Sequence, residues 1–186
     1  MQRQKKLSYE QLILLNSMYL VWLQHVYWTR MLLISIAERL KDQSEVTDRL
    51  LKNPDDVAKI YEEYYGADAA EKIAELLTEH LQIGAELITA LRDGKSAEAD
   101  SLSEEWYINA DKMADAFNRI NQYYDREKLR SMLYKHLDLT TQEVEMRLEK
   151  NYEADIAAFG KVEQEAISMA HYFAMGIMKQ FPMRFM

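Results

Sequence analysis

The chain contains no cysteine, and it has only five glycines and two prolines among 186 residues. The lack of cysteine excludes disulfides, thiolate zinc sites, iron–sulfur clusters and cysteine nucleophiles. So few glycines and prolines argue against a fold of short strands joined by tight turns. The scattered glycines form no phosphate-binding loop, no dinucleotide-binding pattern and no Gly-x-Ser-x-Gly nucleophile turn. We therefore expect no nucleotide-dependent chemistry.

Basic residues are in the minority, with 23 Lys and Arg against 31 Asp and Glu and a net charge of −8. The longest basic cluster is the start of the chain, Arg3-Gln4-Lys5-Lys6. Nucleic-acid binding needs clustered Lys and Arg that contact phosphates. We therefore expect no nucleic-acid partner.

A clean apolar run long enough to cross a membrane is also missing. The most apolar stretch extends from Leu12 to Ile36, and polar residues interrupt it at Asn16, Gln24, His25, Arg30 and Ser35. A buried arginine is costly in a bilayer, and the stretch does not match the layout of a signal peptide. We therefore expect a cytoplasmic protein with no membrane partner, in which this stretch is a helix packed centrally among others.

The residues that are present show helical periodicity nearly throughout. The pattern predicts one domain over residues 1–186, an all-α up-and-down bundle of five long helices and one shorter, broken helix, with more than about two thirds helix. Asn53 is the expected N-cap after the break, with Pro54 at the first helical position. The expected segments are Tyr9–Leu40, Ser44–Leu51 continuing at Asn53–Gly66, Asp68–Arg92, Ser96–Ile120, a helix from Asp125 through Val144, and Tyr152–Gln180.

Three of the four histidines, His25, His80 and His136, recur at nearly equal intervals, each within the apolar stripe of a different expected helix. Three imidazoles that converge in a bundle would bind a divalent transition metal and leave one coordination position open. The alternative is that each is a core histidine, hydrogen-bonded to a carbonyl or an acid.

A loose repeat accompanies this spacing. Asn53 and Asn109 each begin a similar segment and precede His80 and His136 by the same interval, whereas the third copy has Glu165-Ala166 in place of Asn. A period of about 56 residues suggests repeated helical hairpins. If the hairpins are equivalent, the three histidines should lie at comparable depth in the bundle.

Two acids are candidates for further metal ligands. Glu163 occupies an expected core position, and Thr140 and Glu143 follow His136 by about one and two helical turns, so they share one side of its helix. A buried carboxylate needs a cation, a metal or a proton. The Glu-x-x-His motif of di-iron bundles is absent, which argues against a ferritin-like oxidase.

Arg30 suggests a rival site. It lies in an apolar helix beside Trp28 and Thr29, and a guanidinium inside a bundle requires a carboxylate or an anionic ligand. We therefore consider a small-anion site formed by Arg30, Trp28, Thr29 and Thr140. The alternative, which we favour, is an internal ion pair with Glu143 or Glu163.

Three segments resemble a family of small all-helical proteins of spore-forming bacteria. They are Gln24-His25-Val26-Tyr27-Trp28-Thr29-Arg30, Arg49-Leu50-Leu51-Lys52-Asn53-Pro54-Asp55-Asp56 and Met132-Leu133-Tyr134-Lys135-His136-Leu137. The resemblance spans most of the chain and implies an all-helical fold with no established reaction. Some members carry the label acetylglutamate kinase, but this sequence lacks the glycine-rich and strand patterns of the amino-acid kinase fold.

The sequence thus favours a non-enzymatic bundle with a histidine-lined polar interior that binds a divalent metal or a small anion. The alternative is a structural or protein-interaction bundle without a ligand. The apolar tail Met183-Arg184-Phe185-Met186 either folds back on the bundle or contacts a partner chain. A homodimer through this tail or through the apolar first helix is the expected assembly.

Overall fold

The computed structural model describes residues 6–186, of which 87% are helical and none lies in a strand. The expected all-α fold is therefore confirmed for this part of the chain, while Arg3, Gln4 and Lys5 of the basic start lie outside it. The elements are α1 (Tyr9–Ala37), α2 (Gln43–Leu50), α3 (Asn53–Tyr65), α4 (Ala67–Arg92), α5 (Ser96–Ile120), α6 (Arg126–Leu148), α7 (Tyr152–Gln180) and the 3-10 turn η1 (Pro182–Phe185).

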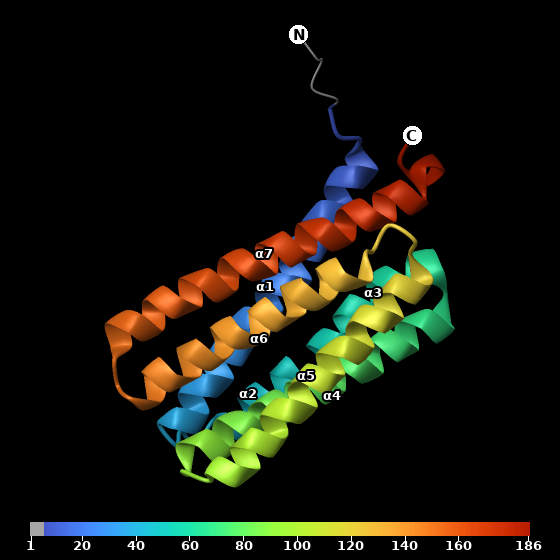
Figure 1. Cartoon of the computed structure of the whole chain (residues 1–186). Helices are drawn as coiled ribbons and strands as arrows, with labels where there is room; N and C mark the ends of the chain where they lie inside the picture. Colours follow the sequence, from blue (N-terminus) through green and yellow to red (C-terminus); the bar gives the residue numbers. More distant parts are fainter. Residues whose placement is uncertain (1–5) are drawn as a thin grey trace.

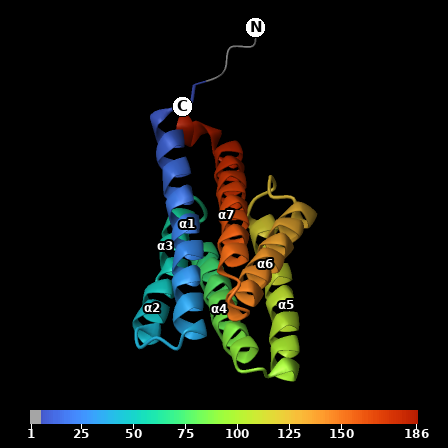
Figure 2. The same cartoon turned by 90° about the vertical axis from the view of Figure 1, so that its left-hand side faces the viewer.

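The helices are paired into three hairpins. The first joins α1 to the two short helices α2 and α3, the second joins α4 to α5, and the third joins α6 to α7 (Figure 1). The first helix of each hairpin, α1, α4 or α6, runs in the same direction along the bundle (Figure 2). Because α1 packs against α3, α4, α6 and α7, it joins the three hairpins.

Local signals account for several helix starts. Ser8 forms a capping box with Gln11 at the start of α1, and the Asp125 side chain accepts a hydrogen bond of 2.7 Å from the backbone N–H of Lys128 in α6. Asn53 differs from the prediction, because Lys52 occupies the N-cap position of α3. The Asn53 amide instead donates a 2.8 Å hydrogen bond to the backbone carbonyl of Val21 in α1. The buried asparagine therefore joins two helices.

At the start of α7, the face that packs against the bundle is not the one predicted from its apolar residues. Helical periodicity predicts that Ile156 packs in the core, but it is 63% exposed, and the expected core residue Glu163 is only half-buried. The buried positions belong to Asp155, Ala158 and Val162. The prediction was wrong here because a buried acid with cationic partners has replaced an apolar residue in the stripe.

The C-terminal tail folds back on the bundle. Phe185 in η1 is buried, and its ring stacks with Tyr64 of α3 at a centroid distance of 6.0 Å. Met183 and Met186 remain exposed. Among the described residues, no helix combines the length and the apolar character that crossing a membrane requires.

Candidate metal centre

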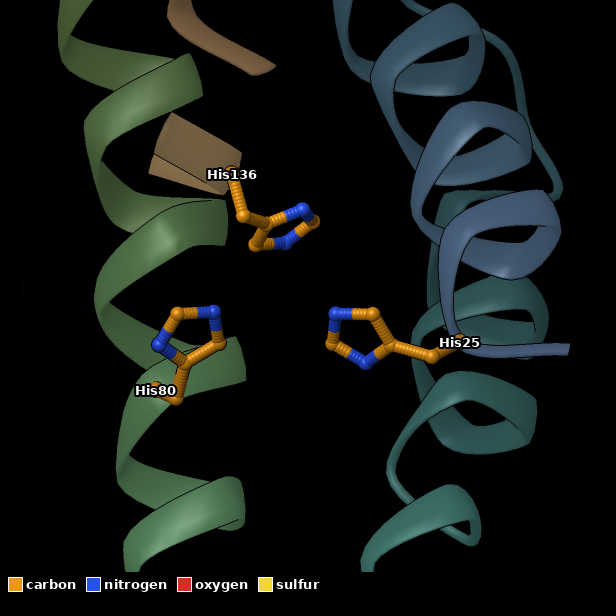
Figure 3. A group of neighbouring side chains, drawn as sticks. All are labelled: His25, His80 and His136. Atoms are coloured by element: carbon orange, nitrogen blue, oxygen red, sulfur yellow. The ribbon is translucent and has the colours of Figure 1, made fainter. Parts of the chain in front are cut away.

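The three recurring histidines meet in the interior of the bundle. His25 of α1, His80 of α4 and His136 of α6 are all buried, and their potential ligand nitrogens lie within 4.8 Å of one another. Figure 3 shows the three rings pointing toward a common centre from three separate helices. Three nitrogens bound to one tetrahedral ion at about 2.0–2.1 Å would lie about 3.3–3.5 Å apart. Small rotations of the side chains would therefore complete a three-imidazole site.

An asparagine orients His80. The Asn109 amide nitrogen donates to the carbonyl of Leu76 at 3.1 Å and to Oε2 of Glu79 at 3.0 Å, which fixes the orientation of the amide. Its oxygen then lies 3.2 Å from Nδ1 of His80. An amide oxygen only accepts hydrogen bonds, so the imidazole proton resides on Nδ1. The lone pair of Nε2 is left for the centre, as in the supported histidine ligands of metal sites.

The same arrangement recurs around His25. The Asn53 amide donates to the carbonyl of Val21, one helical turn before His25, just as the Asn109 amide donates to the carbonyl one turn before His80. The repeat noticed in the sequence therefore corresponds to a repeated contact between paired helices. In each of these two hairpins, a buried asparagine on the second arm hydrogen-bonds to the first helix, one helical turn before the histidine.

The third hairpin departs from this pattern. Glu165 follows His136 at the same interval at which Asn109 follows His80, and it is also buried. Its carboxylate pairs with Lys135 at 2.5 Å. The Nδ1 atom of His136 is buried without a hydrogen-bond partner among the described residues. A buried nitrogen without a partner is costly, and no residue of the third hairpin takes the part that Asn109 plays for His80.

Burial keeps the three imidazoles neutral. Desolvation lowers the pKa of His25 from 6.5 to about 4, and a hydrogen bond with Asn53 opposes this only partly. Desolvation, reinforced by the neighbouring His25, lowers the pKa of His80 to about 3. The pKa of His136 falls well below its usual value for the same reasons, with His80 contributing as well. At neutral pH all three rings therefore offer lone pairs rather than N–H⁺ groups.

A second polar group lies farther along α1 and α6, and α7 also contributes to it. Nη1 of Arg30 contacts Oε1 of Glu143 at 2.5 Å, and the two terminal nitrogens of Arg30 contact the carboxylate of Asp155 at 2.8 and 3.2 Å. Nη1 of Arg147 approaches Asp155 at 3.4 Å from the other side. Both acids are buried, and burial raises the pKa of Glu143 to about 7 even though Arg30 opposes the shift. The guanidinium of Arg30, which the sequence suggested as a site for a small anion, is thus paired with these two carboxylates.

The remaining candidate residues are divided between the centre and other parts of the fold. Thr29 and Thr140 line a small cavity together with the three histidines. Trp28 does not line it, and its ring instead lies under the Arg49 guanidinium at 4.9 Å. Glu163 accepts a hydrogen bond from Tyr27 at the surface.

Neither predicted acidic ligand joins the histidine cluster. Glu143 is paired with Arg30, and Glu163 lies on the outer side of α7. Asp155 was not predicted from the sequence. It lies one helical turn before Phe159 and therefore on the same face of the helix, but apolar periodicity favours its neighbour Ile156 as the buried residue. The donor set that the described residues bring together is three neutral imidazoles.

Comparisons with protein-family models, with curated proteins and with solved structures find no match to this chain. The function of the centre must therefore be inferred from its donor atoms, its burial and its charge.

Proposed function

We propose that His25, His80 and His136 bind one divalent transition-metal ion in the interior of the bundle. The observation that carries this proposal is the convergence of three buried imidazoles from three helices, with ligand atoms within 4.8 Å of one another. Metal binding requires deprotonated ligands, and burial already holds these rings in the neutral form. A bound ion would also give a partner to the Nε2 lone pair of His80, which the hydrogen bond of Nδ1 to Asn109 leaves free.

The donor set favours particular metals. Imidazole nitrogen suits Zn²⁺, Co²⁺, Ni²⁺, Cu²⁺ and Fe²⁺, whereas Ca²⁺ and Mg²⁺ require oxygen ligands. Because Glu143 and Glu163 have other partners, residues 6–186 contribute no carboxylate to the centre. We therefore expect transition metals to bind and Ca²⁺ and Mg²⁺ to have no specific effect.

Metal should stabilise the folded protein, and His80→Leu should abolish the effect. An ion that binds only the folded state at about 100 times its Kd adds about 2.7 kcal/mol, which raises the Tm of a chain of this size by about 5–10 °C. Thermal melts of chelator-treated protein titrated with Zn²⁺ or Co²⁺ test this, with metal content measured in parallel. His171→Leu, which alters an exposed histidine on α7, is the matched control and should retain the increment. Stoichiometric metal in the triple His25, His80 and His136 to Leu variant would contradict the proposal.

We further propose that a second copy of the chain covers one side of α1. Apart from Glu10 and Arg30, α1 carries no Asp, Glu, Lys or Arg along its 29 residues, and part of its surface is apolar and exposed. The residues along this side are Tyr9, Ile13, Asn16, Leu20, Leu23, Tyr27 and Met31. From Tyr9 to Tyr27 they are separated alternately by four and three positions, which is the spacing of a seam between two packed helices, and Met31 follows one turn later. A single Asn within such a seam pairs with its own copy.

Leu20→Glu should convert the dimer to a monomer, because it places two like charges in the seam. Sedimentation equilibrium or light scattering over a range of concentrations gives the oligomeric state. Ile108→Glu on α5 is the matched control, since Ile108 is 55% exposed and Leu20 is 56% exposed. A wild-type protein that is monomeric throughout the range would contradict this assembly.

A further inference from the structure

A small cavity adjoins the histidine cluster on one side. Its volume is about 20 Å³, and its walls include the three histidines together with Thr29, Gly84 and Thr140. Each of these last three residues follows one histidine by four positions, so each lies one helical turn beyond it on the same face. The helices α1, α4 and α6 run in the same direction (Figure 2). The cavity is therefore lined, on all three helices, by residues one turn C-terminal to the histidines.

This position is where a fourth metal ligand would lie. A water molecule needs about 10–15 Å³ of such space, so the cavity accommodates about one water molecule. We propose that the cavity holds the open coordination position of the metal and admits only a ligand of one or two non-hydrogen atoms, which is water in the resting protein. This inference rests on the metal site proposed above.

The threonines explain why water suits the position. The Thr29 hydroxyl donates to the carbonyl of His25, and the Thr140 hydroxyl donates to the carbonyl of His136, each at 2.8 Å. Each hydroxyl proton is therefore already used, and the oxygen lone pairs remain as acceptors. Water bound to a metal through its oxygen has two hydrogens to donate. A ligand without hydrogens gains nothing from these two acceptors.

The walls explain the size limit. Beyond the histidines and threonines, the cavity is lined by Leu32, Leu50, Leu81, Ala85, Ile88 and Trp106. The Trp106 ring is fixed by a 3.0 Å hydrogen bond from Nε1 to the carbonyl of His80. A Cβ atom added to Gly84 would lie 3.2 Å from the same ring, so this wall is already at contact distance. A larger ligand would have to displace packed side chains.

Two neutral ligands of different size test the proposal. Nitric oxide has two atoms and forms a distinctive paramagnetic adduct with Fe²⁺ that electron paramagnetic resonance detects. Imidazole has a five-membered ring and changes the visible absorption of Co²⁺ when it coordinates. We expect nitric oxide to bind the Fe²⁺-loaded protein and imidazole to leave the spectrum of the Co²⁺-loaded protein unchanged.

A matched pair of variants tests the role of the wall. Leu32 and Leu33 are adjacent, and each is 1% exposed, but only Leu32 lines the cavity. Leu32→Ala should let imidazole bind about tenfold more tightly or better, whereas Leu33→Ala should behave as the wild type. Circular dichroism verifies that both variants are folded, and the wild-type comparison of nitric oxide with imidazole stands without them.

Metal content, measured before any ligand is added, separates the two proposals. A protein that retains no metal would overturn both the metal site and this inference. A metal-loaded wild type that binds imidazole, or that fails to bind nitric oxide, would overturn the size-limited fourth position alone and leave the three-histidine site standing.

Discussion

Acidification from about pH 6.5 to pH 4.5 should destabilise the metal-free protein by about 5 kcal/mol. The three buried histidines have folded-state pKa values of about 4, about 3 and well below 6.5, whereas in the unfolded chain each titrates near 6.5. Between these values the unfolded state binds three more protons than the folded state. Stability is therefore fully present above pH 6.5 and is lost as the pH falls toward the folded-state pKa values.

Protonation of Glu143 has the opposite effect on stability over the same pH range. Its pKa rises from 4.5 to about 7 on folding, so between these values the folded state holds one proton that the unfolded state lacks. The net difference is about two protons, which corresponds to a slope of about 2.7 kcal/mol per pH unit. Across two pH units this loss is comparable to the whole stability of many domains, about 5–15 kcal/mol.

Urea unfolding at a series of pH values measures this slope. His80→Leu removes one of the titrating groups and should reduce the slope to about 1.4 kcal/mol per pH unit, whatever it does to stability at neutral pH. His171→Leu, at an exposed position outside the cluster, should leave the slope unchanged. A wild type that is equally stable at pH 4.5 and pH 6.5 would refute the assignment of neutral, buried imidazoles.

Arg30→Met should lower stability by about 3–5 kcal/mol, because removing one partner of a buried ion pair leaves uncompensated charge behind. The change would leave the buried carboxylate of Asp155 with the more distant Arg147 alone, and Glu143, deprived of its cation, would take up a proton. Methionine retains much of the volume of the arginine stem, so loss of packing contributes little. The expected decrease in Tm is about 6–20 °C.

Two further variants identify the cause of this loss. Adding Asp155→Asn to Arg30→Met removes the undercompensated buried charge and should recover about 1–2 kcal/mol. Arg39→Met breaks an exposed pair with Asp93, in which the arginine is 68% exposed, and should cost no more than about 1 kcal/mol. If Arg30→Met were as stable as Arg39→Met in urea unfolding, the Arg30 network would not be a structural ion pair.

The sequence alone predicted the helical fold and most of its boundaries. These features depend on local chemistry, namely apolar residues at helical spacing, few glycines and prolines, and capping side chains such as Asp125. The nearly equal intervals between His25, His80 and His136 also predicted which three histidines belong together. This was possible because each occupies the equivalent helix of a repeated hairpin, and equivalent positions lie at equal depth when the helices run in parallel.

The tertiary structure decided which polar residues share a site. Asp155 turns inward in place of Ile156 because Arg30 and Arg147, which are distant in sequence from each other, lie opposite it. The same arrangement assigns Glu143 to Arg30 instead of to the histidines. Helical periodicity identifies the face on which a residue lies, but the partner that compensates a buried charge belongs to another helix. Only the packing of α1, α6 and α7 against one another determines that partner.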